Sequence, residues 1–347
     1  MSRVAVVVPC FNYGHLLGGC LDSILSQDGV DVRVLVIDDA STDDSAETVR
    51  RLAAGDRRVE ASLHATNRGH IDTYNEGLLD WADGDYCVLL SADDLLTPGA
   101  LGRAARIMDQ RPAVGMVYGR PVYFQDHRDL PRFPTTHRGT TVWSGQTWIA
   151  DRCRTAYNVI SSPEVVVRTD VQQKVGGYRK ELPHAGDLEM WLRIAAVADV
   201  AYVRGVPQAL YRVHAASMQH SRYQGVLTDL VQRRDVFDAF FELHADEVRD
   251  SARLHAMANR ALAGQALWEV CRSYDRDDLD LVPVDELVEF AARTCPQQGE
   301  LPEAAMLRRR QLLGPAVCHR TQLFAGTAAW RRAQRRWRHE RWKRRGV

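Results

Sequence analysis

Short apolar runs alternate with helical patterns along the first ninety residues. Residues 4–8, 32–37 and 86–90 are apolar and rich in β-branched side chains, which is typical of buried strands. Residues 16–25 place apolar side chains at helical spacing, and further helices are predicted to reach about residues 52 and 81. Strand, short loop and helix therefore repeat, which predicts an α/β fold with a mostly parallel sheet and helices on both faces.

Acidic pairs follow two of these strands. Asp38 and Asp39 come after the second run, and Asp93 and Asp94 after the run that ends at residue 90. Ligands of parallel sheets bind beyond the carboxyl ends of the strands, so we expect both pairs to meet residues 9–12 there. Adjacent carboxylates repel each other and are costly to desolvate unless a cation lies beside them. A divalent cation that is bound to phosphate oxygens would accept such carboxylates as ligands. The competing interpretation is that they form turns and helix starts.

The usual phosphate-binding loops are missing from the sequence. No Gly-x-Gly-x-x-Gly follows the first strand, and no Gly-x-x-x-x-Gly-Lys-Ser/Thr occurs. Dinucleotide and P-loop functions are therefore not expected. A phosphate-bearing ligand would have to be bound by a metal ion and by scattered basic groups.

The second half of the chain carries fewer candidate groups. Residues 114–124 and 165–167 are strand-like, whereas 125–138 indicate a polar loop. Asp187 stands at the start of a predicted helix, where it is either a helix cap or a functional acid. His214 ends a short strand. After about residue 221 the pattern becomes helical, with helices predicted over 226–243, 245–271 and 284–292.

Composition and charge describe a protein with an ordinary core and a basic tail. The 347 residues are 45% hydrophobic, and the net charge is zero. Residues 325–347 contain nine Lys or Arg and one acid, so the tail carries +8 and the remainder −8. None of the seven cysteines forms a Cys-x-x-Cys pair, which favours free thiols in a reducing compartment over a zinc site. Without a signal-peptide pattern or a long apolar run, a cytoplasmic location is expected.

The basic tail has two interpretations. It is a solvated helix or disordered arm, or it is an interfacial anchor that attaches the protein peripherally to anionic lipid at the inner face of the cell membrane. Trp330 and Trp337 lie seven residues apart, on one face of a helix. Nucleic acid is not an expected partner, because the remaining chain is acidic and no recognition motif is present. We expect the rest of the chain to fold without the tail.

Six motifs occur in the order seen in family 2 glycosyltransferases of the GT-A fold, which residues 1–215 resemble. They are Val-Val-Pro-Cys-Phe-Asn at 7–12, Ser-Ile-Leu-Ser-Gln at 23–27, Val-Ile-Asp-Asp-Ala-Ser-Thr-Asp at 36–43, Asn-Arg-Gly at 67–69, Leu-Ser-Ala-Asp-Asp at 90–94 and Gly-Asp-Leu-Glu-Met-Trp at 186–191. The resemblance implies a GT-A domain over residues 1–218. We expect a helical extension over 219–325 and the basic tail over 326–347.

The resemblance also implies how the donor is bound. Phe11, where the family usually has Tyr, would stack near the base, Asp39 would hydrogen-bond it, and Asp93 would contact the ribose. Further nucleotide-sugar contacts are expected from Pro9, Asn12, Asp38, Asn67 and Arg68. Residues 73–75 are Thr-Tyr-Asn where the family often has Ala-Arg-Asn, so Arg68 or a later residue is expected to replace a phosphate contact.

For the chemistry, the resemblance implies an inverting, metal-dependent enzyme. Asp94, with Asp93 and His214 close by, would hold a Mg²⁺ or Mn²⁺ ion that bridges the diphosphate, and Asp187 would be the general base. Ser91 and Gly186 stand where the family often has carboxylates. The sugar would pass from a nucleotide, expected to be UDP, to a hydroxyl of a glycan, lipid-linked or small-molecule acceptor in polysaccharide, glycolipid or other glycoconjugate synthesis.

Two alternatives stay open at this point. The first is a non-catalytic module that binds a nucleotide sugar or takes part in assembly, since a fold does not determine a function. The retained Asp93, Asp94 and Asp187 argue against it. The second is a sugar nucleotidyltransferase, which lacks support because its Gly-rich signature is missing after the first strand.

Overall fold

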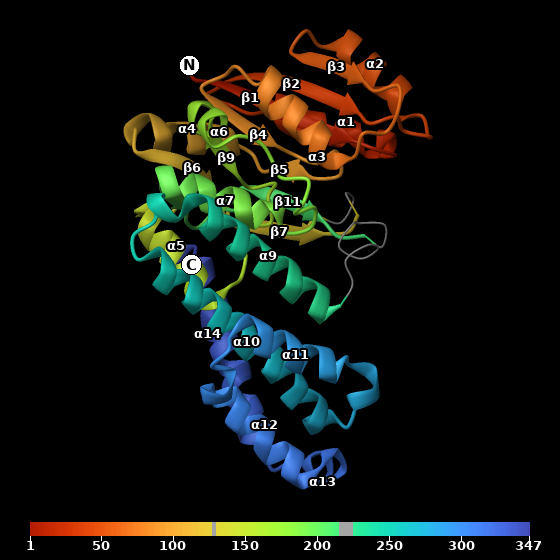
Figure 1. Cartoon of the computed structure of the whole chain (residues 1–347). Helices are drawn as coiled ribbons and strands as arrows, with labels where there is room; N and C mark the ends of the chain where they lie inside the picture. Colours follow the sequence, from red (N-terminus) through yellow and green to blue (C-terminus); the bar gives the residue numbers. More distant parts are fainter. Residues whose placement is uncertain (127–129, 215–224) are drawn as a thin grey trace. The chain divides into compact units, whose positions relative to one another are not determined.

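The computed structural model describes residues 1–126, 130–214 and 225–347, and the chain divides into two compact units (Figure 1). The sheet unit comprises Met1–Trp148, Val159–Ser217 and Lys343–Gly346. The helical unit comprises Ile149–Asn158, Met218–Trp342 and Val347. The boundary predicted between residues 218 and 219 lies outside the described residues.

An eight-stranded sheet forms the centre of the sheet unit, in the order β3-β2-β1-β4-β9-β6-β10-β8. Its strands are β1 (Arg3–Cys10), β2 (Asp31–Asp38), β3 (Val59–Leu63), β4 (Tyr86–Leu89), β6 (Val114–Tyr118), β8 (Thr140–Trp143), β9 (Val166–Arg168) and β10 (Asp199–Val203). The prediction of a mostly parallel α/β sheet is confirmed for β1 to β4. However, β9 runs antiparallel between β4 and β6, and β8 is antiparallel to β10. A short apolar run does not encode the direction in which it pairs.

The central strand β1 is buried on both faces. Val4, Val6 and Val8 belong to a core cluster that includes apolar residues of α1 (Gly14–Leu25) and α4 (Ala100–Gln110). Val7 points to the opposite face, where a Cβ on Gly77 would lie 2.2 Å from its methyl carbon. This close approach explains a glycine at that position, and burial on both faces explains why the strand has no polar alternation.

Helices complete the sheet unit. They are α2 (Ser45–Gly55), α3 (His70–Asn75), the π-helix η1 (Glu76–Trp81), α6 (Thr169–Val175) and α7 (Gly186–Val197), and α5 (Gly145–Thr155) is shared with the helical unit. The single helix predicted to reach Trp81 is therefore an α-helix that continues as a π-helix.

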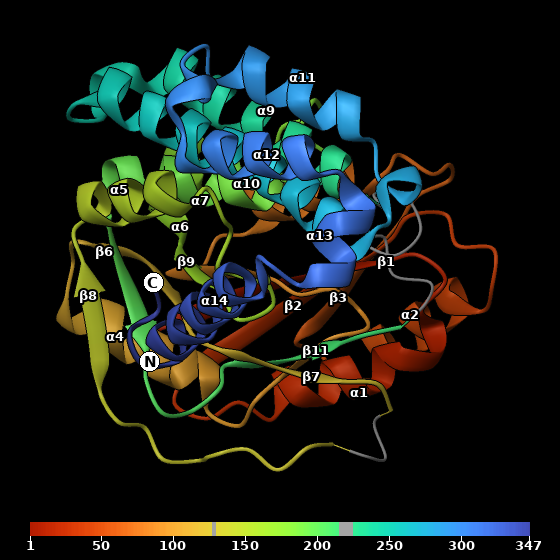
Figure 2. The same ribbon diagram turned by 90° about the horizontal axis from the view of Figure 1, so that it is seen from below.

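A second, three-stranded sheet lies beyond the end of β4. In it, β5 (Leu95–Leu96) pairs antiparallel with β11 (Ala209–Arg212), and β11 runs parallel to β7 (Pro121–Phe124), its neighbour in both ribbon views (Figure 2). The competing interpretation of the acidic pair is a turn or a helix start, but the strand β5 directly follows Asp94 and α4 begins only at Ala100. This strand ties the acidic pair to β11.

The helical unit is built around the long helix α10 (Ser251–Arg276), which packs against α9 (Val226–His244), α11 (Val284–Thr294), α12 (Pro302–Leu313) and α13 (Pro315–Thr321). Short 3-10 turns lie at Ala245–Glu247 (η3), Leu279–Leu281 (η4) and Gln298–Glu300 (η5). The three helices predicted here are confirmed, although the one predicted from residue 245 begins at Ser251. Among the described residues, no helix has the length and apolar character needed to cross a membrane, and all seven cysteines are free and buried.

The basic tail is helix α14 (Ala325–Arg345), and only part of it is solvated. Trp330 and Trp337 are 57% and 64% exposed. In contrast, the Tyr202 hydroxyl donates a hydrogen bond to the main-chain oxygen of Lys343 at 2.9 Å, and the Tyr118 hydroxyl donates one to that of Gly346. The last residues therefore pack against β6 and β10. That the rest of the chain folds without the tail stays a prediction.

Substitution of Gly346 tests this packing. Gly346 has φ 84°, and a Cβ would lie 2.4 Å from Cγ of Tyr202. Gly346→Ala should therefore lower the free energy of unfolding by about 1–2 kcal/mol, through left-handed strain and the clash. Gly326→Ala is the matched control, because its Cβ would meet nothing within 4 Å. Urea unfolding of both variants measures the difference, and equal stability would contradict the packing.

Candidate functional site

The carboxyl ends of β1, β2 and β4 bring the predicted clusters together. Cys10 is in register with Asp38, and Pro9 accepts a hydrogen bond from the Ala92 N–H at 3.3 Å. Asn12, at φ 61°, accepts hydrogen bonds from Thr42 through its side-chain oxygen and donates its N–H to Ser41. The loops after the three strands therefore lie at one edge of the sheet, as the sequence predicted.

Asp39 is surrounded by hydrogen-bond donors. Its Oδ1 accepts from the Arg68 N–H at 2.8 Å and lies 2.7 Å from Nδ1 of His64, while its Oδ2 accepts from the Gly69 N–H at 2.9 Å. Burial opposes ionisation of Asp39, but these hydrogen bonds outweigh it and lower the carboxyl pKa. Asn67 donates its amide to the Asp39 main-chain oxygen at 2.9 Å. Asp39 is thus a fixed, ionised carboxylate.

His64 and Glu76 belong to this site although the sequence analysis did not select them. Nε2 of the buried His64 lies 2.9 Å from Oε2 of Glu76, and the Arg68 guanidinium donates to the same carboxylate oxygen at 3.1 Å. Since His64 directly follows β3, the strand-end rule applied to a third strand would have found it. The Arg68 side chain is 55% exposed. It is held beside the site rather than buried in it.

Asp38 and Phe11 differ sharply in exposure. Asp38 is buried, with Oδ2 accepting from the Ser41 N–H at 3.1 Å and Oδ1 lacking a protein partner. It therefore orders the loop after β2. The Phe11 ring is 46% exposed at the end of β1, available to a flat ligand.

The acidic pair is held by the second sheet. Asp94 Oδ1 accepts the Arg212 main-chain N–H at 2.8 Å, and Asp93 Oδ2 lies 3.0 Å from Nε2 of His214. The Arg212 guanidinium instead donates to main-chain oxygens, those of Asp93 at 2.9 Å and Gln125 at 3.1 Å. Burial, and then the charge of Asp93, raise the pKa of Asp94 well above its usual range. Within the described chain no arginine or lysine forms an ion pair with Asp93 or Asp94, and the charge of Arg212 only partly opposes the rise in the pKa of Asp94.

A divalent cation fits this arrangement. Asp94 and Asp93 offer hard oxygen ligands, and a cation would relieve the repulsion that raises the pKa of Asp94. Within the described residues, no three or more His, Cys, Asp or Glu side chains are grouped so that they could hold a metal ion by themselves. A bound ion would therefore take its other ligands from phosphate oxygens and water. His214 already contacts Asp93, and residues 215–224 directly after it are outside the described chain.

Asp187 is the second residue of α7, but it does not cap that helix. The N-cap position is Ala185, and no side chain caps the helix. The Ser162 hydroxyl donates a hydrogen bond to Asp187 Oδ2, and Tyr178 forms another with the carboxylate. Burial raises the pKa of Asp187 and these bonds oppose the rise. The Asn75 side-chain oxygen accepts a hydrogen bond from the Tyr178 N–H at 2.7 Å, and its amide nitrogen donates one to the Tyr178 main-chain oxygen at 2.9 Å. These two bonds fix the main chain that carries the Tyr178 ring.

Tyr74 connects Asp187 with the acidic pair. Burial raises the pKa of Tyr74, and the charges of Asp187, Asp93 and Asp94 each raise it further. All three carboxylates therefore act electrostatically on one buried phenol. Their grouping in one transfer site and their roles stay predictions.

Glu164 is a fourth acid that the sequence did not indicate. It is 1% exposed, its Oε1 accepts the Ser161 N–H at 2.7 Å, and its Oε2 has no protein partner. Burial, followed by the charge of Asp187, raises the pKa of Glu164 to about 8. Glu164 lies in the irregular segment before β9, where no periodicity marks it. It is therefore a neutral acid at pH 7 beside the candidate base.

The pH dependence of stability tests this state of Glu164. The folded protein binds a proton on Glu164 up to a pKa of about 8, against 4.5 for the free group, so stability should fall as pH rises through this window. The slope from one such group is about 1 kcal/mol per pH unit. Urea unfolding in EDTA should show a smaller decline for Glu164→Gln, and the exposed Glu181→Gln should behave as wild type. Equal slopes for all three proteins would contradict the assignment.

Comparison with known proteins agrees with this geometry. The sequence profile of Glycosyl transferase family 2 matches residues 5–161. An uncharacterized Mycobacterium tuberculosis protein is 29% identical over 265 residues, which cover 72% of this chain and 80% of that protein. The Campylobacter jejuni GalNAc(5)-diNAcBac-PP-undecaprenol beta-1,3-glucosyltransferase is 37% identical over 102 residues, 29% of this chain and 33% of the relative.

Solved structures resemble the chain over most of its length. Residues 1–349 of Staphylococcus aureus TarS in complex with UDP-GlcNAc have a TM-score of 0.61 at 17% identity, covering 89% of this chain and 92% of that TarS chain. The mannosyltransferase PcManGT from Pyrobaculum calidifontis, in complex with GDP-Man and Mn²⁺, has a TM-score of 0.51 at 22% identity, covering 90% and 80%. These likenesses show the GT-A fold. Through residues 5–161 the chain belongs to glycosyltransferase family 2, and it is a glycosyltransferase that uses a nucleotide-sugar donor.

Proposed function

We propose that the enzyme transfers a sugar, with inversion and with Mg²⁺ or Mn²⁺, from a UDP-linked donor to an acceptor hydroxyl. The observation that carries the proposal is the division of the carboxylates. Asp93 and Asp94 form a pair that contacts His214 but forms no ion pair with an arginine or lysine of the described chain, whereas Asp187 is held separately by Ser162 and Tyr178. One group suits a cation and a diphosphate, and the other suits a proton acceptor.

At the donor end, Asp39 has room for one more hydrogen bond. A carboxylate offers about four acceptor positions, and three are filled by His64, Arg68 and Gly69. The free position on Oδ2 suits an N–H of a pyrimidine base, while the exposed Phe11 ring offers a stacking surface. This supports a uracil base. A panel of nucleotide sugars tested with Mn²⁺ would decide the base and the sugar.

At the reacting end, Asp187 is proposed as the general base. A raised pKa brings a carboxyl closer to the working pH, which improves it as an acceptor for a hydroxyl proton. Ser162 and Tyr178 fix the carboxylate, so that the acceptor oxygen lies in line with the anomeric carbon. A bound divalent ion would stabilise the charge that develops on the leaving diphosphate.

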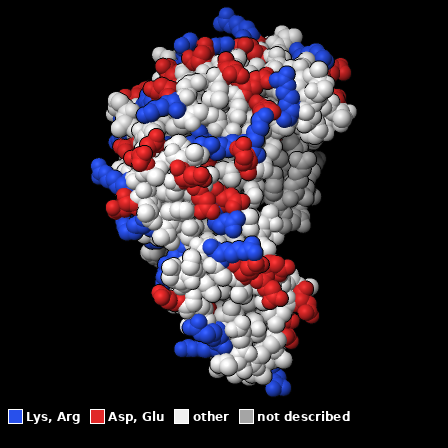
Figure 3. All heavy atoms as spheres, viewed as in Figure 1, with Lys and Arg blue, Asp and Glu red and all other residues white. Residues whose placement is uncertain are grey.

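The acceptor is proposed to be a glycan, lipid-linked or small molecule used in glycoconjugate synthesis. The name of the Campylobacter relative describes a lipid-linked acceptor for that protein, which supports a similar class here. We propose a cytoplasmic enzyme that is peripheral on the inner membrane face, with the exposed Trp330 and Trp337 of the basic helix as anchor. Basic and acidic groups intermingle on the face shown in Figure 3, which suits nucleic acid poorly.

Asp94→Asn tests the metal role, because it should lower the transfer rate without lowering the stability of the metal-free protein. The amide keeps the acceptor for the Arg212 N–H but loses the charge, so transfer with Mn²⁺ should fall on the order of 10²-fold or more. In EDTA the same variant should be at least as stable as wild type, because burial opposes the charged form. Donor turnover and urea unfolding measure both effects. Near wild-type turnover would contradict the metal role, and a wild type that binds donor without hydrolysing or transferring it would indicate a non-catalytic module.

Asp187→Asn tests the base. Loss of a general base costs about 10²- to 10⁴-fold in rate, while donor binding should persist. Asp170→Asn is a matched control, because the exposed Asp170 is also the second residue of its helix, α6. Wild-type rates should rise with pH through the raised pKa of Asp187. If Asp187→Asn weakens donor binding and regains a normal rate at saturation, Asp187 is a binding residue instead.

A further inference from the structure

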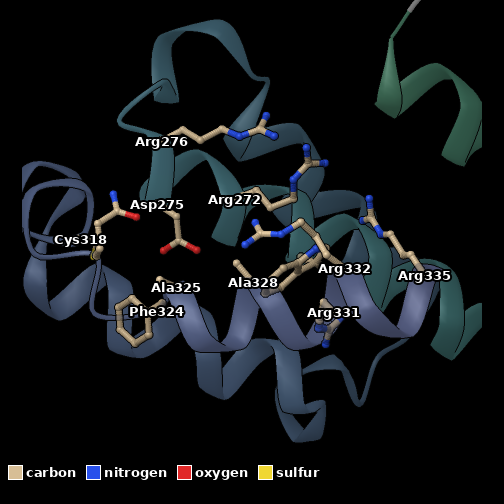
Figure 4. Close-up of a pocket in the computed structure, with 12 residues that line it drawn as sticks. Arg272, Asp275, Arg276, Cys318, Phe324, Ala325, Ala328, Arg331, Arg332 and Arg335 are labelled. Carbon is tan, nitrogen blue, oxygen red and sulfur yellow. The ribbon is translucent and has the colours of Figure 1, made fainter. Parts of the chain in front are cut away.

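The helical unit contains an arginine-lined pocket that shares no residue with the transfer site. The cavity has a volume of about 320 Å³, and all of its lining residues belong to the helical unit. Arg272 and Arg276 come from α10, whereas Arg332 and Arg335 come from α14 (Figure 4). Arg332 extends toward α10 in this view. Two helices far apart in sequence therefore direct guanidinium groups at the same space.

The acids around the pocket are too few to neutralise these arginines. Glu269 pairs with Arg272 and lies 3.8 Å from Arg335. Glu303 pairs with Arg331, another lining residue.

Asp275, the one acid among the described residues that line the cavity, is already paired. Both of its oxygens accept hydrogen bonds from Arg310, each at 2.8 Å. Six arginines thus share three carboxylates, and within the described chain Arg276 and Arg332 form no ion pair. Like charges on facing helices repel unless an anion lies between them.

Aromatic residues give the pocket firm walls. Trp268 is 4% exposed, and the Arg331 guanidinium lies 4.3 Å from its ring centroid. The Arg310 guanidinium lies 3.9 Å from the ring of Phe324. Stacking and pairing hold both arginines in place, so that Arg331 forms part of the wall and Arg310 supports the lining residues Asp275 and Phe324. The unpaired Arg276 and Arg332 stay free to bind a ligand.

We propose that this pocket binds a phosphate-bearing ligand, a phosphomonoester or a diphosphate. Guanidinium groups match phosphate oxygens with paired hydrogen bonds, and several of them around one cavity suit a dianion better than a single carboxylate. A cavity of about 320 Å³ holds more than one phosphate group and leaves room for an organic portion against Trp268. The ligand is either a soluble phosphate compound or the phosphate head group of a lipid. The inference does not depend on the proposed transfer mechanism.

Calorimetric titration of the full chain with pyrophosphate in EDTA tests the soluble source. Arg276→Gln with Arg332→Gln should weaken binding on the order of tenfold for each guanidinium removed. Arg336→Gln with Arg338→Gln is the matched control, because both residues are exposed on α14 and neither lines the cavity. Far-UV circular dichroism and urea unfolding establish that the wild type and the two double variants are equally folded and equally stable.

Sedimentation with vesicles tests the lipid source. Phosphatidylcholine vesicles that carry phosphatidic acid, a phosphomonoester, are compared with phosphatidylglycerol vesicles of matched surface charge. A preference for phosphatidic acid that the Arg276/Arg332 variant loses, and the Arg336/Arg338 variant keeps, assigns a lipid head group. Pyrophosphate binding lost in the same way, without that preference, assigns a soluble ligand. If neither interaction occurs, or if both double variants weaken it equally, the pocket is only a solvated basic surface and the proposal is wrong.

Discussion

The electrostatic repulsion between two buried neighbouring aspartates is the constraint on which the sheet unit depends. Asp93 and Asp94 lie in the loop that follows β4, and burial opposes the charge of Asp94. The three-stranded sheet provides the Arg212 N–H for Asp94 and places His214 beside Asp93, but directs the Arg212 guanidinium to main-chain oxygens. The pair is therefore fixed in position and left short of positive charge, which is the state that a cation on a diphosphate would satisfy.

The other acids differ because their surroundings differ. Hydrogen bonds from Arg68, His64 and Gly69 lower the pKa of Asp39 despite its burial. Burial raises the pKa values of Asp187 and Glu164, and Glu164 has an oxygen with no protein partner. Chemically similar carboxyl groups are therefore suited to different tasks. Asp39 suits a fixed anion that hydrogen-bonds a nucleotide base, Asp187 suits a proton acceptor, and Glu164 suits a neutral acid.

The helical unit uses charge in another way. Its arginines are partly neutralised by Glu269, Asp275 and Glu303, and partly left free around a firm-walled cavity. A basic tail that looks uniform in sequence is therefore divided by the fold. Arg331 is a stacked, paired wall residue, Arg332 lines the cavity unpaired, and Lys343 belongs to the sheet unit through its main chain.

The sequence by itself determined the α/β order, the strand ends that carry Asp38, Asp39, Asp93 and Asp94, and the family, because these depend on local periodicity and on residues close in the chain. It also placed Asp187 at a helix start, but could not tell a cap from a functional acid. Only the tertiary structure decided that Ser162 and Tyr178 hold Asp187, that Glu164 is buried beside it, and that β9 runs antiparallel. Burial, strand direction and charge pairing arise from contacts between residues far apart in the chain, and a linear pattern of apolar and polar positions does not contain them.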